Sequence, residues 1–363
     1  MWYVSQGCTN TITQVATMMH FPLENLENDS SGFMRSAVLA AMAELDVATM
    51  VLRCDNAATA TQCASACSCD ARAMQTLLDA LVALGYFSKS GIGATAIYAV
   101  VAPYASLLDS RESESYIPML RHRAHLQRHW SRLSWAVKNG TPQKESTSSF
   151  LGATQDSITF ISAMNAIALR LAETTMKALD KAKVFDSLPP DMHMLDIGGA
   201  SGTYTEAFLR KLPQATATLF DLPVGIAQAK KRFVDSDMEA RVVLMEGDFT
   251  KTDFPDGFDF AWISAIIHQM GQEACRDLYR KTLAALKPGG MIAIRDFVMD
   301  DNKTSPEAGA LFGINMLLCT AQGRVYAFDE IRTDLMSIGF DRVEHAVNVP
   351  TMSAVVTALK PCS

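Results

Sequence analysis

Carboxylates follow three successive apolar segments of the chain, and this spacing predicts a binding site. Asp196 lies in the sequence Met-Leu-Asp-Ile-Gly-Gly-Ala-Ser-Gly-Thr that begins at Met194, Asp221 ends the next apolar segment, and Asp248 follows the third. Ligands of an open α/β sheet bind at the carboxyl ends of its parallel strands, so these side chains are expected along one edge. Three carboxylates suit a ligand that offers hydroxyl and amino hydrogens and carries positive charge.

The glycines after Asp196 narrow the choice of ligand. Gly198-Gly199-x-x-Gly202 is not the G-x-G-x-x-G of dinucleotide sites, and an acid two residues before the first glycine disfavours a pyrophosphate. Asp221 is placed to accept from a ribose diol, and Asp248 from an adenine amino group. S-adenosylmethionine therefore fits, whereas NAD and ATP do not. The alternative is that these acids cap loops and the glycines form a turn, and for Asp196 or Asp248 alone that interpretation would be favoured.

His268 follows the fourth apolar segment directly, where it would face the acceptor of a transferred group. A phenol has a pKa of about 10 and is mostly un-ionised at neutral pH, whereas imidazole titrates near 6.5. A positioned histidine can therefore take a phenolic proton as general base, a step worth roughly 10²–10⁴-fold. The alternative is a strand-end histidine that hydrogen-bonds only to backbone.

The elements that must position these residues alternate between strand and helix from about His193 onward, which predicts an α/β fold with a mostly parallel, doubly wound sheet. The expected strands are Met192–Ile197, Ala217–Asp221, Arg241–Glu246, Phe258–Ile263 and Met291–Phe297. Lys287–Gly290 is expected to be a turn, and Arg342–Leu359 to supply two antiparallel strands at one edge. A long helix is expected over Thr159–Ala182.

A mostly helical domain is expected over residues 1–150, followed by the α/β domain over residues 151–363, with the polar stretch Lys144–Ser149 as the joint. Its predicted helices are Phe33–Leu52, Thr59–Cys67, Arg72–Leu84 (with Asp70 as N-cap) and Leu120–Val137, and Thr95–Val100 is expected in a small β-wing. This is a winged-helix pattern, but acids outnumber bases in it. It therefore favours an interaction surface over DNA binding.

Composition excludes several classes of protein. The 363 residues are 49% hydrophobic and 20% charged with a net charge of −7, which is globular and offers no basic patch for nucleic acid. The absence of long apolar runs argues against a membrane protein, and the N-terminal residues do not resemble a targeting signal, so a cytoplasmic location is expected. Cys63, Cys67 and Cys69 have no histidine nearby and are interpreted as small buried thiols, with no metal expected.

Several motifs resemble those of the two-domain class I S-adenosylmethionine-dependent O-methyltransferases, which include plant caffeate and isoflavone enzymes and bacterial polyketide enzymes. The motifs are DIGGASG (196–202), LFDLP (219–223), EGDF (246–249), IIHQMGQEAC (266–275) and LKPGG (286–290). The resemblance extends from about Phe33 to Leu359. It implies a Rossmann-like catalytic domain that binds S-adenosylmethionine, a winged-helix dimerisation domain, a homodimer and a small-molecule acceptor.

The resemblance also implies roles for individual residues. The cofactor would be bound by Gly198, Gly199, Gly202, Asp221, Leu222, Asp248, Phe249 and Ser264, the last at a position where plant members have a lysine. His268 would be the base and Asp296 the acid that orients it, while Val325 replaces a second acid and cannot hydrogen-bond. The acceptor would contact Phe160, Met164, Asn165, Phe312, Met316, Thr320 and Tyr326.

Three alternatives stay open from the sequence. His122, His125 and His129 lie on one helical face, where they would contact an acidic acceptor, bind a metal or pack between domains. A thioether acceptor, such as a methylthio-hydroxy acid, needs no base and would make the protein an S-methyltransferase. A winged-helix regulator or a catalytically inactive relative is an alternative of another class.

Overall fold

The computed structural model describes residues 22–143 and 153–362, and for residues 153–159 only the backbone. Contacts divide the chain into two compact units, Met1–Glu112 and Ser113–Ser363. The division falls before the expected boundary at residue 150 because helices α7 (Ile117–Trp130) and α8 (Leu133–Asn139) pack with the second unit, on α9 (Ala153–Lys181) and α13 (Glu307–Cys319). The joint expected at Lys144–Ser149 lies outside the described residues.

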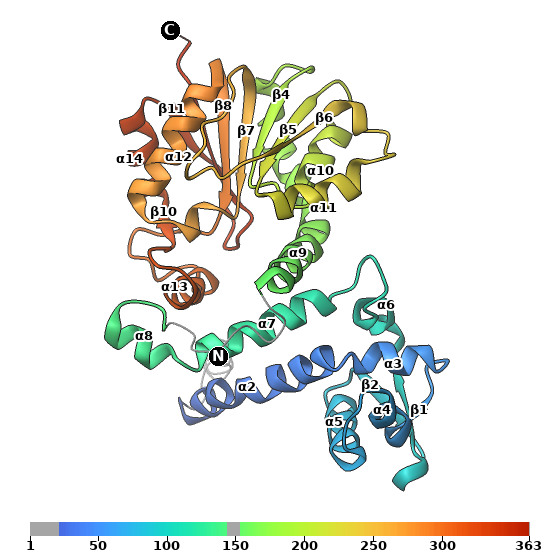
Figure 1. Ribbon diagram of the computed structural model, residues 1–363. Coiled ribbons are helices and arrows are strands. Elements are labelled where there is room, and N and C mark those ends of the chain that lie inside the picture. Colours follow the sequence, from blue (N-terminus) through green and yellow to red (C-terminus); the bar gives the residue numbers. More distant parts are fainter. Residues whose placement is uncertain (1–21, 144–152, 363) are drawn as a thin grey trace, which may run out of the picture. The chain divides into compact units, whose positions relative to one another are not determined.

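The first unit combines helices with a small antiparallel sheet (Figure 1). Its elements are α2 (Pro22–Glu44), α3 (Val47–Arg53), β1 (Ala58–Thr59), α4 (Ala60–Ala66), α5 (Ala71–Ala83), β2 (Phe87–Ser90), β3 (Ile97–Val100) and α6 (Ala105–Leu108). The predicted helix pair is confirmed as α4 and α5. Asp70 is the N-cap of α5, because its Oδ1 accepts the Ala73 N–H at 2.8 Å.

Two predicted helices are each divided in the structure. The helix expected over Phe33–Leu52 breaks at Asp46, which has a left-handed φ of 56° and accepts hydrogen bonds from the hydroxyls of Thr49 and Ser110, each at 2.8 Å. The helix expected over Leu120–Val137 breaks after Ser131, whose hydroxyl donates to the Arg128 carbonyl at 2.8 Å. At both breaks a polar side chain forms hydrogen bonds that end the helix. A periodic pattern of apolar residues gives no sign of such hydrogen bonds.

The second unit is built on a seven-stranded sheet of order β11-β12-β8-β7-β4-β5-β6. The strands are β4 (His193–Ile197), β5 (Thr216–Asp221), β6 (Val242–Glu246), β7 (Phe258–Ser264), β8 (Leu286–Asp296), β11 (Asp341–Val347) and β12 (Ala354–Leu359). β6, β5, β4, β7 and β8 are parallel, β12 pairs antiparallel with β8, and β11 pairs antiparallel with β12 at the edge. The predicted doubly wound sheet with its antiparallel pair is confirmed.

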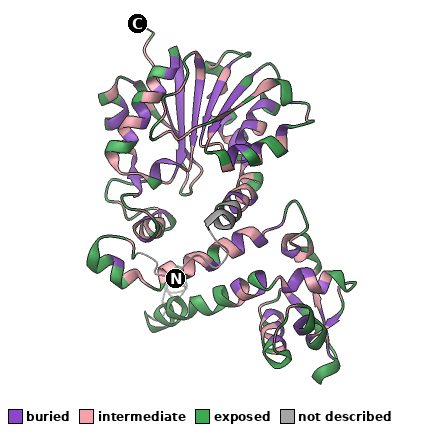
Figure 2. Ribbon diagram, viewed as in Figure 1, coloured by how far each residue is buried: buried purple, intermediate pink, exposed green. Residues whose placement is uncertain are grey.

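Helices cover both faces of this sheet. α9, α10 (Thr203–Lys211) and α11 (Pro223–Phe233) pack on one face, around Phe208, Phe260 and Trp262. α12 (Gln272–Ala285) and α14 (Phe328–Ile338) pack on the other, around Tyr279. Figure 2 shows the strands buried between these layers. No helix in the described part of the chain is long and apolar enough to cross a membrane.

The turn expected at Lys287–Gly290 is part of β8. Leu286 pairs with Phe258 before a register shift, and Gly289 and Gly290 exchange backbone hydrogen bonds with Lys360 beyond the end of β12. The glycines therefore mark an irregularity within a strand. The short strands β9 (Val298–Met299) and β10 (Tyr326–Ala327) pair with each other beside α13.

Candidate functional site

The loop of residues 198–202 joins β4 to α10 in a left-handed conformation. φ is +72° at Gly198, 49° at Ala200 and +78° at Gly202. A Cβ atom at Gly202 would also lie 2.4 Å from Cε2 of Phe233, so this position requires glycine for the loop's own packing. Gly199 is equally confined, since a Cβ there would lie 2.7 Å from Cγ of Leu219.

Asp196 lies beneath this loop and does not line the ligand edge as the sequence suggested. It is 2% exposed, and its Oδ2 accepts the Thr205 hydroxyl at 2.5 Å. Burial raises the pKa of Asp196 to about 7, because the charged form is disfavoured away from water. Its carboxyl group therefore holds the first turn of α10, directly after the loop, from the protein interior.

Asp221, at the end of β5, connects to the same loop. Its Oδ2 accepts the Ala200 N–H at 2.7 Å and its Oδ1 accepts the Leu222 N–H at 2.6 Å. Burial raises the pKa of Asp221 above its usual value. Each carboxylate oxygen has two lone pairs, so Asp221 keeps acceptor capacity for a ligand. Leu222 is 49% exposed beside it.

Asp248 and Phe249 follow β6. Asp248 Oδ1 accepts the Thr250 hydroxyl at 2.6 Å, and Oδ2 pairs with Lys251 at 2.9 Å. These hydrogen bonds lower the pKa of Asp248 to about 2, so it is ionised at neutral pH. Phe249 packs on the core of the sheet, and its carbonyl accepts from Lys281 at 3.0 Å.

Ser264 ends β7 and accepts a hydrogen bond from a buried arginine. Nη1 of Arg295, on the adjacent strand β8, donates to Ser264 Oγ at 3.1 Å, and the guanidinium lies 5.1 Å from the Tyr204 ring centroid. Arg295 is 3% exposed, and neither its Nε nor the Tyr204 hydroxyl has a hydrogen-bond partner among the described residues. A cation from the neighbouring strand thus lies next to the position where plant enzymes have a lysine.

His268 and Asp296 form a buried pair at the carboxyl ends of β7 and β8. Nδ1 of His268 lies 2.8 Å from Oδ1 and 2.9 Å from Oδ2 of Asp296, and the two residues are 6% and 1% exposed. Asp296 also accepts the backbone N–H of Phe297 at 2.8 Å. The edge-on ring of Phe312 lies 4.8 Å from the imidazole, centroid to centroid. Nε2 of His268 has no hydrogen-bond partner among the described residues, and it is the ring atom left for a proton transfer.

The structure brings only some of the predicted acceptor residues to His268. Phe312 contacts it, and Met316 is buried one turn later on α13. Thr320 ends α13, where its hydroxyl donates to the Met316 carbonyl at 2.7 Å and accepts the Gly323 N–H at 2.8 Å. Tyr326 is 2% exposed and its hydroxyl donates to the Met270 carbonyl at 2.7 Å, so it is not open to an acceptor.

The histidine face of α7 lies beside α9 in the same unit. The His122 ring lies 5.3 Å edge-on from the half-exposed ring of Phe160, and burial lowers the pKa of His122 to about 4. Nε2 of His125 lies 3.0 Å from Nε2 of His129. Trp130 Nε1 donates to Asn315 on α13 at 3.1 Å. Among the described residues no group of three or more His, Cys, Asp or Glu side chains is placed to hold a metal.

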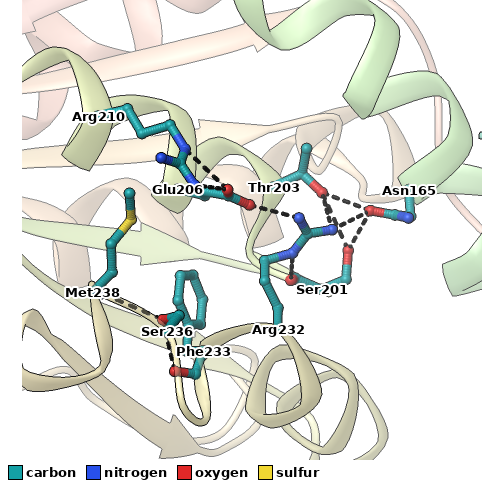
Figure 3. Close-up of polar contacts among 9 residues, drawn as sticks. All are labelled: Asn165, Ser201, Thr203, Glu206, Arg210, Arg232, Phe233, Ser236 and Met238. Atoms are coloured by element: carbon teal, nitrogen blue, oxygen red, sulfur yellow. Dashed lines mark hydrogen bonds and ion pairs between the residues drawn. The ribbon is translucent and has the colours of Figure 1, made fainter. Parts of the chain in front are cut away.

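Sequence reasoning missed a polar network around Arg232 of α11 (Figure 3). Arg232 donates to the Ser201 carbonyl at 2.7 Å and pairs with Glu206 at 2.6 Å. It also donates to Asn165 Oδ1 at 2.6 Å and to the Thr203 hydroxyl at 3.0 Å. Asn165 is predicted to contact the acceptor, and in the structure its amide oxygen accepts hydrogen bonds from Ser201 and Thr203 at the glycine loop. The partners are 26 to 67 residues from Arg232 in sequence, so no local pattern signals the network.

Comparison with known proteins gives consistent matches. A family model described as an O-methyltransferase domain matches residues 130–341, and a model of the O-methyltransferase dimerisation domain matches residues 29–108. Acetylserotonin O-methyltransferase of Gallus gallus is 26% identical over 325 residues, covering 87% of this chain and 91% of that protein. The tetracenomycin polyketide 8-O-methyl transferase TcmO of Streptomyces glaucescens is 28% identical over 290 residues, covering 78% and 82%.

A solved structure also shares the fold. Human N-acetylserotonin methyltransferase in complex with S-adenosylmethionine superimposes with a TM-score of 0.79 at 22% identity, covering 95% of this chain and 99% of that chain. At this identity the likeness shows the fold alone. The two-part architecture, and the sheet on which the candidate site is built, are therefore shared with that enzyme.

Proposed function

The chain belongs to the S-adenosylmethionine-dependent O-methyltransferases of small molecules, and we propose that it methylates a phenolic hydroxyl with His268 as general base. The observation that carries this proposal is the buried His268–Asp296 pair. The names of the relatives support a phenolic acceptor, because acetylserotonin is a hydroxyindole and tetracenomycin is an aromatic polyketide.

The pair is arranged for proton transfer at one defined atom. Because Asp296 accepts from Nδ1 at 2.8 Å, the ring proton is held there and Nε2 presents a lone pair. A carboxylate in this position also stabilises the imidazolium that forms when Nε2 takes a proton. The ring of Phe312, whose centroid lies 4.8 Å from that of the imidazole, helps to exclude water from His268.

The residues at the strand ends fit S-adenosylmethionine. Asp221 keeps free lone pairs beside the glycine loop, where a ribose diol offers hydroxyl donors. Asp248 is ionised, and among the described residues its Oδ2 pairs with Lys251, an exposed side chain that a ligand can displace at little cost. Two carboxylates suit a cofactor that carries positive charge and no phosphate. When bound, the cofactor supplies an electrophilic methyl group on a sulfonium.

The two alternatives have less support. Methyl transfer to a thioether needs no base, so it would not use the buried His268–Asp296 pair. The curated relatives named above are O-methyltransferases. A regulator would not need this pair either. Neither alternative has an observation in its favour.

We also propose that the protein is a homodimer formed through its first unit. The dimerisation model covers residues 29–108, and Leu23, Leu26, Phe33 and Met34 on α2 are 58% to 67% exposed. Large apolar side chains gathered on one helix usually mark an interface. Light scattering is expected to give twice the 39.5 kDa of one chain. A single-chain mass at micromolar concentration would refute this.

The function is tested by measuring methyl transfer from labelled S-adenosylmethionine to a panel of phenols and methylthio acids. Wild type is expected to methylate phenols, and His268→Ala to lose roughly a hundredfold or more in kcat. S-adenosylhomocysteine binding by the variant serves as the control for folding, and it should be unchanged. Turnover retained by His268→Ala on a phenol would refute the base, and transfer to methylthio acids alone would favour the alternative.

A further inference from the structure

The loop of residues 198–202 is held on both sides by charged side chains. The Asp221 carboxylate accepts the N–H of Ala200 at 2.7 Å, and the Arg232 guanidinium donates to the carbonyl of Ser201 at 2.7 Å. Ala200 has a φ of 49°, a left-handed conformation that is unfavourable for a residue other than glycine. A loop with this conformation needs outside contacts to remain in one arrangement.

Arg232 also connects the loop to a separate helix. Its Nη2 donates to Asn165 Oδ1 on α9 at 2.6 Å, and the same oxygen accepts the hydroxyls of Ser201 at 3.0 Å and Thr203 at 2.7 Å (Figure 3). Three donors on one oxygen fix the orientation of the amide group. The NH₂ group of Asn165 is therefore the part of the amide that remains for a ligand, to which it would donate a hydrogen bond.

The ion pair with Glu206 completes the arrangement. Arg232 Nη1 lies 2.6 Å from Glu206 Oε2, and the two side chains are 19% and 24% exposed. Arg210 pairs with Oε1 of the same glutamate at 2.8 Å, but it is 60% exposed, and among the described residues its side-chain hydrogen bonds go to Glu206 alone. The chain thus offers a matched pair of arginines, which share a partner and differ in contact with the loop.

We propose that Arg232 is a positioning residue that holds the cofactor loop and α9 in the arrangement that binds S-adenosylmethionine. The inference rests on the proposed function. Arg232 itself need not contact the ligand, because its effect passes through the Ser201 carbonyl and through Asn165. The planar guanidinium donates to the loop, to α9 and to α10 at the same time. A lysine ammonium cannot reproduce this arrangement of hydrogen bonds.

The expected effect is a loss of cofactor affinity. If Arg232→Gln leaves the loop in the binding arrangement only about a tenth of the time, the dissociation constant for S-adenosylhomocysteine rises about tenfold. Arg232→Lys keeps the charge opposite Glu206 and is expected to fold, yet it should weaken binding at least about fivefold. Arg210→Gln is expected to bind as wild type does.

Calorimetric titration of the full chain with S-adenosylhomocysteine tests this, with melting temperatures measured without ligand. The expected result is weaker binding by both Arg232 variants and unchanged binding by Arg210→Gln. Binding by Arg232→Lys within twofold of wild type would overturn the proposal, and a lowered melting temperature alone would assign Arg232 a structural role. Failure of wild type itself to bind would refute the proposed function instead.

Discussion

Replacing Asp296 by Asn should change which nitrogen of His268 carries the proton. Asp296 Oδ1 accepts both from His268 Nδ1 and from the Phe297 N–H, each at 2.8 Å, and Oδ2 lies 2.9 Å from Nδ1. An Asn oxygen that keeps the Phe297 bond leaves the NH₂ group at the position of Oδ2, 2.9 Å from Nδ1, from where we expect it to donate to Nδ1. The NH₂ then donates to Nδ1, the ring hydrogen moves to Nε2, and Nε2 can no longer accept a proton.

The size of the loss follows from the step that is removed. General-base catalysis contributes roughly 10²–10⁴-fold, so kcat for a phenolic acceptor is expected to fall about 100- to 1,000-fold at pH 7.5, or about 3 to 4 kcal/mol in the barrier. The phenolate fraction of an acceptor with a pKa near 10 grows about tenfold per pH unit. The variant should therefore recover relative to wild type as the pH rises toward 9.5.

Steady-state kinetics of both proteins between pH 7 and 9.5 check this, with S-adenosylhomocysteine affinity as the control. A kcat within threefold of wild type at pH 7.5 would refute the assignment of the proton to Nδ1. A large loss that stays constant across the pH range would show that Asp296 acts on structure rather than on the protonation of the base.

Three further predictions concern neighbouring residues. Asp221→Asn should weaken the binding of S-adenosylhomocysteine about tenfold or more, as measured by calorimetry. The reason is that an amide group replaces a carboxylate that accepts hydrogen bonds from hydroxyl donors. An affinity equal to that of wild type would exclude Asp221 from the site. Burial raises the pKa of Asp196 from 3.8 to about 7, so its stabilising contribution is fully present below about pH 4 and is lost as the pH rises through about 7. The free energy of unfolding of Asp196→Asn, measured in urea, should therefore decline less between pH 5 and 8 than that of wild type, by up to about 3 kcal/mol. Equal declines in the two proteins would contradict a buried carboxyl group with a raised pKa. Phe312→Ala should raise the KM for the acceptor roughly fivefold to tenfold and leave cofactor affinity unchanged, since its ring contacts His268 and not the glycine loop; an equal loss of both affinities would argue for general loosening of the unit.

The sheet and its strand ends could be predicted because their signals are local. Apolar segments alternate with helical patterns, and the carboxyl ends of parallel strands meet at one edge, so the sequence predicts Asp196, Asp221 and Asp248 along that edge and His268 directly after the next strand. Asp196 is the exception, because its side chain is buried beneath the glycine loop. The resemblance supplied Asp296 as the partner of His268, which the 2.8 Å contact confirms as a neighbour.

Other features of the fold and of the candidate site depend on contacts between residues far apart in the sequence, which no local sequence pattern predicts. The break at Asp46 uses Ser110, 64 residues away, and Arg232 meets Asn165 across 67 residues. Tyr326 was assigned to the acceptor from its sequence position, but the short strand β10 turns its hydroxyl to the Met270 carbonyl. Side-chain direction in such places is set by tertiary packing, which outweighs position in the chain.

Consecutive residues of a strand point to opposite faces of the sheet, and on β8 this separates two buried charges. Arg295 lies with Tyr204 on one face and Asp296 with His268 on the other, and both are almost fully buried. A buried charge is costly unless an opposite charge lies nearby. The Arg295 guanidinium and the Asp296 carboxylate lie on opposite sides of β8, and each lowers the cost of burying the other. Ser264 is the cross-strand neighbour of Arg295 in the sheet register. We therefore expect positions 264 and 295 to covary among related enzymes, with a lysine at 264 or an arginine at 295 supplying the single cation that this end of the sheet requires.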